Sequence, residues 1–226
     1  YTKPQNSIQI LALNQENEYL SNEKVRQAIA MAIDKDEIIN TVVWGNGTKI
    51  GSHLPVSSPY YVDTTDVMPY NVEKAKALLA EAGYPEGKGF PTITYSTNDT
   101  GYHKAVAEYL QQVYKDLGIT MNIDIVDWSS FTPKRRAGEY EMARNGWVMD
   151  YNDASNMIEL FVSSNGNNDG KYNNPAFDKA MNDSKVADKT AHFAALHEAE
   201  KIVSEDYGFI PVAYYNDFWL QSTSLK

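Results

Sequence analysis

The chain has 226 residues, which is enough for one large domain or two small ones. Its 30 acidic and 20 basic side chains give a formal net charge of −10, which argues against nucleic acid and anionic membrane surfaces as partners. There is no cysteine, so disulfides, thiolate metal sites and cysteine nucleophiles are excluded.

The first half of the chain predicts one strand followed by capped helices. Residues 7–13 alternate apolar and polar side chains, as a strand does. Ser21 or Asn22, and further along the chain Asp34 and Asn71, precede apolar patterns of helical spacing and are expected to cap helices. Residues 45–69 show no period and predict a long irregular loop.

A strand–helix–strand unit follows. Residues 92–96 and 119–126 predict strands, and residues 99–117 between them predict a long helix, which implies parallel pairing of the two strands. Residues 129–137 predict a short helix that leads to a strand at residues 140–148.

The last third of the chain predicts two helices and then two strands. The helices are expected at residues 176–186 and 190–206, and the strands at 209–215 and 218–221. The sum is a mixed α/β domain. Its apolar runs are too short to cross a bilayer, and the polar start of the chain, which lacks Met, is expected for a mature form or an excised fragment.

Few features of the sequence favour catalysis. No nucleophile elbow, phosphate-binding loop or dinucleotide-binding fingerprint occurs. The scattered histidines lack the spacing of a zinc site and are expected to be surface or half-buried residues, namely His53, His103, His192 and His197.

Two acidic clusters have both a chemical and a structural interpretation. Asp150 and Asp153 could serve a carboxylate-dependent hydrolase, but neighbours in sequence more often shape a turn and cap a helix. Residues 165–170 partly imitate a calcium loop. Ala176 stands where the bidentate Glu belongs, so a polar surface turn is expected instead.

The segment of residues 128–153 gathers aromatic, basic and acidic side chains around one strand. Arg144 lies in the middle of that strand and needs either a partner or a wet cleft. Gly146 lets another backbone approach closely. A peptide would need such parts, yet Arg144 pairing with a nearby acid and Trp147 lying in the core explain the pattern equally well.

Four ordered motifs resemble one known family. They are KVRQAIAMAID (24–34), YNVEKAKALLAEAGY (70–84), GWVMDYND (146–153) and YNNPAFD (172–178). The chain resembles the extracellular solute-binding proteins of peptide ABC transporters, the oligopeptide- and dipeptide-binding family. The resemblance implies an α/β fold, a periplasmic-binding-protein type II-like lobe with a mixed sheet flanked by helices.

The resemblance also implies an arrangement of lobes. Residues 1–226 would form a single lobe, the C-terminal ligand-binding lobe of a larger two-lobed protein whose other lobe is absent. Residues 8–13 would follow the first crossing of the hinge, and residues 220–226 would lie near the return.

The site follows from the same resemblance. Asp150 would accept a peptide's α-ammonium, and Arg144 or Arg135 would pair with a ligand carboxylate. Strand backbone would contact the extended peptide, and the tryptophans would line its side-chain pockets. The candidate ligand-binding residues are Asp150, Trp147, Trp128, Arg144, Arg135, Gly146, Val148 and Tyr151.

The implied function is capture of oligopeptides for uptake by an ABC importer, without catalysis, cofactor or metal. The implied partners are a peptide and the membrane permease subunits, with the protein monomeric. The implied location is outside the cytoplasm, either tethered by a lipid anchor or periplasmic. Alternatives are a family member that binds a metal chelate, haem, a sugar or a signalling peptide and, less favoured, the hydrolase.

Overall fold

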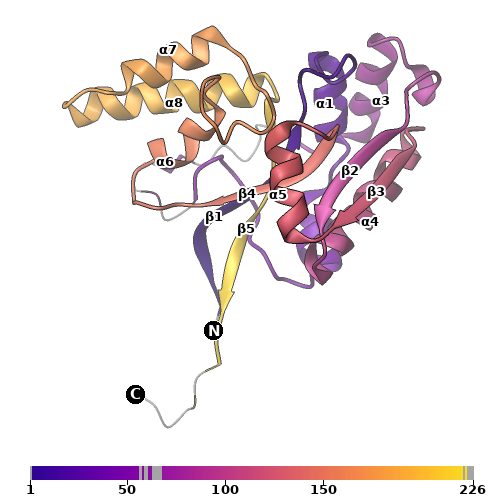
Figure 1. Cartoon of the computed structure of the whole chain (residues 1–226), viewed down its shortest axis with the longest axis horizontal. Coiled ribbons are helices and arrows are strands. Elements are labelled where there is room, and N and C mark those ends of the chain that lie inside the picture. Colours follow the sequence, from indigo (N-terminus) through magenta and orange to yellow (C-terminus); the bar gives the residue numbers. More distant parts are fainter. Residues whose placement is uncertain (1, 56–57, 59–60, 63–67, 221, 223–226) are drawn as a thin grey trace.

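The computed structural model describes residues 2–55, 58, 61–62, 68–220 and 222. Part of the predicted loop 45–69, and Gln221 of the last predicted strand, therefore lie outside the described residues. Five strands form one sheet in the order β3-β2-β4-β1-β5 (Figure 1). The strands are β1 (Thr2–Leu13), β2 (Ile93–Asn98), β3 (Met121–Val126), β4 (Met142–Val148) and β5 (Phe209–Phe218).

The sheet is mixed, as the sequence predicts. β2 is parallel to β3 and to β4, whereas β1 is antiparallel to both β4 and β5. The carboxyl ends of β2, β3 and β4 therefore lie at the same end of the sheet as the amino end of β1. Thr2 pairs with Phe218, so the first and last strands run side by side at that end (Figure 1).

Eight α-helices cover the sheet in the described part of the chain. The predicted caps are confirmed: the side chains of Asn22, Asp34 and Asn71 each accept a hydrogen bond from a backbone N–H in the following first turn. The helices are α1 (Glu23–Met31), α2 (Lys35–Glu37), α3 (Val72–Glu81), α4 (Gly101–Asp116), α5 (Trp128–Ala137), α6 (Ser155–Ile158), α7 (Pro175–Asp183) and α8 (Lys189–Glu205).

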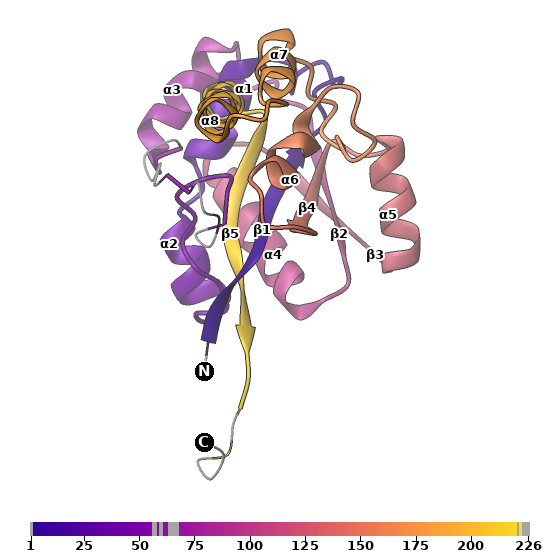
Figure 2. The same cartoon turned by 90° about the vertical axis from the view of Figure 1, so that its left-hand side faces the viewer.

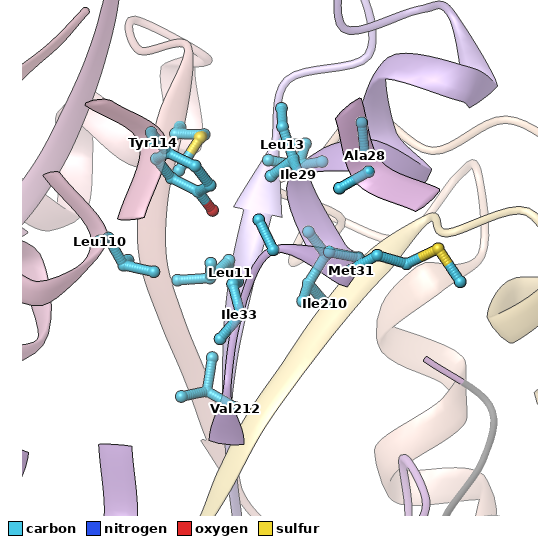
Figure 3. Close-up of a cluster of buried hydrophobic side chains, with 14 of the residues drawn as sticks. Leu11, Leu13, Ala28, Ile29, Met31, Ile33, Leu110, Tyr114, Ile210 and Val212 are labelled. Carbon is cyan, nitrogen blue, oxygen red and sulfur yellow. The ribbon is translucent and has the colours of Figure 1, made fainter. Parts of the chain in front are cut away.

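Two apolar cores lie on opposite faces of the sheet. Leu11 and Leu13 of β1 pack with α1, α3 and α4, and Figure 3 shows this cluster with Leu110 and Tyr114 of α4. Ile8 of β1 belongs to the second core, which contains residues of α5, α6, α7 and α8. Turning the molecule shows the strands side by side across the view, from β5 at the left to β3 at the right (Figure 2).

Some predicted elements differ in extent. β1 begins at Thr2 rather than Ser7, and its inner part is buried on both faces because helices pack on both sides of the sheet. The two predicted C-terminal strands are one, β5, which ends at Phe218, and residues 219–220 form no strand. The helix predicted from Asp34 has a single α-turn and continues as a π-turn at Ile38–Val42.

Candidate functional site

Asp150 directly follows β4, at the end of the sheet where the parallel strands terminate. Its backbone N–H donates to Oδ1 of Asn156 at 2.8 Å, which fixes the turn. Its side chain is exposed, and within the described residues its carboxylate accepts no hydrogen bond and pairs with no cation. Asp150 is therefore an anionic group available to a cation from outside this part of the chain.

Arg144 of β4 has no acid partner among the described residues. Its Nε donates to Nε2 of His103 at 3.1 Å, and its guanidinium carbon lies 5.2 Å from the centroid of the Trp128 ring. The alternative in which Arg144 pairs with a nearby acid is therefore not what the structure shows. A half-buried guanidinium held by an imidazole and an aromatic face keeps its positive charge uncompensated.

His103 lies in the first turn of α4 and is 6% exposed. Burial, together with the positive charge of Arg144, lowers its pKa to about 3. Because an arginine N–H can only donate, Nε2 of His103 must carry the lone pair, and the ring is neutral. His103 therefore orients Arg144 without neutralising it.

Further polar groups lie buried on the face of the sheet that carries Arg144 and packs against His103. Gln9 of β1 is fully buried, and neither polar atom of its amide has a hydrogen-bond partner among the described residues. The buried hydroxyl groups of Tyr102 and Tyr215 also have no hydrogen-bond partner among the described residues, and the centroids of the two rings lie 6.0 Å apart. Buried polar groups are ordinarily satisfied by water or by a ligand, so this region suits a polar group.

The edge of β4 that faces β2 is paired over only part of its length. β2 and β4 are in register at Tyr95 with Met142 and at Ser96 with Ala143, whereas β4 pairs with β1 as far as Val148. In the described part of the chain, β2 therefore pairs with no residue of the stretch from Arg144 to Val148. A strand edge of this kind can accept an extended peptide.

Gly146 permits a close approach, as its place in a strand suggests. A Cβ at this position would lie 2.8 Å from the carbonyl oxygen of Ile8 and 3.3 Å from the ring of Tyr215. The group that approaches Gly146 is therefore this chain's own β1 backbone. The backbone N–H of Gly146 donates to Oδ1 of Asn145 at 2.7 Å.

Arg135 is held inside the protein. Its Nε lies 2.7 Å from Oδ2 of Asp169, and the two side chains are 10% and 4% exposed. Burial raises the pKa of Asp169 although Arg135 opposes this, and burial lowers the pKa of Arg135. Arg135 thus has an internal counter-ion that Arg144 lacks. The prediction that residues 165–170 form a surface turn is wrong for its last part, because Asp169 is buried to hold Arg135.

The remaining candidates differ in exposure. Trp128 is 54% exposed at the start of α5, Val148 is 61% exposed and Tyr151 is 50% exposed. Trp147 is half-buried against the second core, and its indole Nε1–H donates to Oδ1 of Asn156 at 3.2 Å. Trp147 thus combines core packing with a hydrogen bond to a residue that also holds Asp150.

Asp153 has a structural role, as expected for a turn. Its Oδ1 accepts from the backbone N–H and the hydroxyl of Ser155, and Nε2 of His192 lies 3.2 Å away. In the described part of the chain no group of three metal-ligating side chains occurs, and no helix is long and apolar enough to span a bilayer.

Two residues of the site were missed by sequence reasoning. The prediction that the histidines are surface or half-buried residues is wrong for His103 and His53, which are 6% and 1% exposed, and the sequence patterns do not single out Asn156. His103 follows the carboxyl end of a parallel strand, where ligand sites gather in α/β sheets, and that position could have singled it out. Nothing in the local sequence points to Asn156.

Comparison with known proteins identifies the family. Residues 1–169 match the family "Bacterial extracellular solute-binding proteins, family 5 Middle". This match covers most of the chain, and the chain belongs to that family. Its fold is that of the periplasmic-binding-protein type II peptide binders, which confirms the predicted fold class.

Individual relatives agree with this assignment. The chain is 30% identical to the oligopeptide-binding protein OppA of Bacillus subtilis (strain 168) over 94% of this chain and 41% of that protein. It is 34% identical to heme-binding protein A of Haemophilus influenzae over 97% of this chain and 41% of that protein. The crystal structure of Haemophilus influenzae OppA in complex with RPPGFSPFR matches with a TM-score of 0.83 and 28% identity, over 96% of this chain and 44% of that one. The chain spans about two fifths of the curated relatives it matches.

Proposed function

We propose that this chain is the ligand-binding lobe of a protein that captures oligopeptides for an ABC importer. The observation that carries the proposal is the pair of uncompensated charges along β4: the free carboxylate of Asp150 after its end and the acid-free guanidinium of Arg144 in its middle. A peptide carries the complementary charges at its two termini. Relatives named for oligopeptides and a relative solved with a peptide support this ligand class.

The strand edge between these charges fits an extended backbone. A peptide beside residues 144–148 would add a strand on the β2 side of β4 and contact the backbone near Gly146 and Val148. Trp128 and Trp147 would contact its side chains. Arg135, already paired with Asp169, would support the site from within rather than bind the ligand directly.

The wider assembly follows from the same proposal. The chain would be one lobe of a two-lobed receptor. β1 and β5 run side by side at the end of the sheet where Asp150 lies, which supports a hinge there. The receptor would act outside the cytoplasm, tethered by a lipid anchor or free in the periplasm, as a monomer that delivers ligand to permease subunits. It would perform no covalent chemistry.

A second candidate is a receptor for haem. The similarity to heme-binding protein A favours it, since that relative is matched over nearly the whole chain. The guanidinium of Arg144 suits a propionate of haem, whereas the carboxylate of Asp150 suits an ammonium group and would repel a propionate.

The test is titration of the product of the complete open reading frame with a peptide library and with haem. We expect calorimetric binding of peptides with an intact peptide recovered afterwards. Cleaved peptide would contradict a receptor and favour the hydrolase. Haem binding by absorbance, without peptide binding, would favour the second candidate.

A further inference from the structure

Asn156 connects two candidate ligand-binding residues through one buried oxygen. It lies on α6 and is 2% exposed. Its Oδ1 accepts both the indole Nε1–H of Trp147, at 3.2 Å, and the backbone N–H of Asp150, at 2.8 Å. Both partners can only donate, so the contacting atom must be the amide oxygen.

This double contact fixes the indole ring of Trp147 relative to the backbone from which the Asp150 carboxylate projects. Trp147 is in β4 and Asp150 lies beyond its end, one residue after Met149, whose backbone N–H donates to the carbonyl oxygen of Asn6 in β1 at 2.8 Å. The oxygen of Asn156 ties the backbone at Asp150 to the edge of the indole ring. Without it, an indole N–H and a backbone N–H would both lose their acceptor, which is costly for any such group that stays buried.

We propose that Asn156 is the positioning residue that sets the geometry of the ligand-ammonium site. Asn156 acts through Trp147 and Asp150 and need not touch the ligand. This inference deepens the proposed function and rests on it for the ligand, whereas the placement of the indole ring can be measured without any ligand.

The test uses three variants. Asn156→Leu has the same number of side-chain heavy atoms and the same branching but no acceptor, and Asn156→Asp keeps the acceptor oxygen. Asn14→Leu is the matched control, because Asn14 is also buried and its side chain also bonds to backbone groups, but near Gly138 and Tyr140 at the far end of β1.

The first readout is the solvent exchange of indole N–H groups by NMR, on the chain without ligand. In the unmodified chain the Trp147 indole N–H should exchange more slowly than that of Trp44, which is 90% exposed. Asn156→Leu should speed up the exchange at Trp147, whereas Asn156→Asp and Asn14→Leu should not. Equal exchange at Trp147 and Trp44 in the unmodified chain would overturn the proposal even if Asn156→Leu did not fold.

The second readout is the affinity of the complete open reading frame product for one peptide with a free or an acetylated amino terminus. Asn156→Leu should weaken binding of the free-amine peptide about tenfold and reduce the preference over the acetylated one. Asn156→Asp should preserve the preference, as should Asn14→Leu. A folded Asn156→Leu variant with an unchanged preference would overturn the proposal. If the unmodified protein bound neither peptide, the proposed function would fail, and indole exchange would still decide the role of Asn156.

Discussion

Arg144 donates from Nε to Nε2 of His103 over 3.1 Å, so a permanently charged guanidinium is held against a neutral imidazole instead of a carboxylate. The arrangement orients the arginine and leaves its charge for another partner. It also requires His103 to stay unprotonated in the folded protein.

This requirement makes stability depend on pH. An unfolded histidine binds a proton below about pH 6.5. Folded His103, desolvated and facing Arg144, has a pKa lowered to about 3. Between these values the unfolded state binds more protons, so the free energy of unfolding falls as the pH falls. From pH 7 to pH 5 the contribution of His103 should decline by about 2 kcal/mol.

The variant that isolates this contribution is His103→Gln, which keeps an acceptor for Arg144 but does not titrate. Urea unfolding at pH 7 and pH 5 should show a smaller loss of stability for His103→Gln than for the unmodified chain. His53→Gln should also reduce the loss, because burial lowers the pKa of His53 to about 4, but without any contact to Arg144. If His103→Gln lost as much stability between pH 7 and pH 5 as the unmodified chain, His103 would not be held neutral in the folded protein.

The buried pair of Arg135 and Asp169 should matter mainly as a pair. Asp169→Asn leaves a buried cation without its counter-ion and should lower the free energy of unfolding by about 3 kcal/mol. Arg135→Met combined with Asp169→Asn should cost less than the sum of the single changes. Chemical denaturation of the three variants measures the coupling, and additive losses would show that the two charges do not interact.

Gly146 should be required by the packing of β4 on β1. Gly146→Ala places a methyl group 2.8 Å from the carbonyl oxygen of Ile8, so the strands must shift, at a cost of about 1–3 kcal/mol. Gly166→Ala is the control, because a Cβ there meets nothing within 4 Å. Thermal unfolding should separate the two variants, and equal midpoints would mean that the strand pair adjusts freely.

Local patterns in the sequence predict much of this fold. The caps at Asn22 and Asn71 and the parallel unit of β2, α4 and β3 follow from spacing and turn chemistry, which depend on nearby residues. The burial of β1 on both faces does not, because an alternating pattern predicts that Gln9 faces solvent, and the helices that cover the two faces come from distant segments of the chain.

The sequence likewise predicts only part of the candidate site. The motif around Trp147 and Asp150 identifies the segment, and the strand period places Arg144 within it. The partners that decide the state of each charge come from distant segments: His103 of α4 for Arg144 and Asp169 for Arg135. No local pattern distinguishes a free arginine from a buried, paired one.

In the proposed function the carboxylate of Asp150 receives the α-ammonium of a peptide. The most direct measurement is calorimetry of the complete open reading frame product with free-amine and acetylated forms of one peptide. Asp150→Asn is compared with Asp116→Asn. This control makes an equal change of charge at an exposed residue at the C-terminal end of α4, whereas His103 lies in the first turn of that helix. Asp150→Asn should weaken binding of the free-amine peptide about 30-fold or more and abolish the preference for it, while Asp116→Asn changes neither. Unchanged affinity and preference in Asp150→Asn would contradict the proposed role of Asp150 in binding the peptide's α-ammonium.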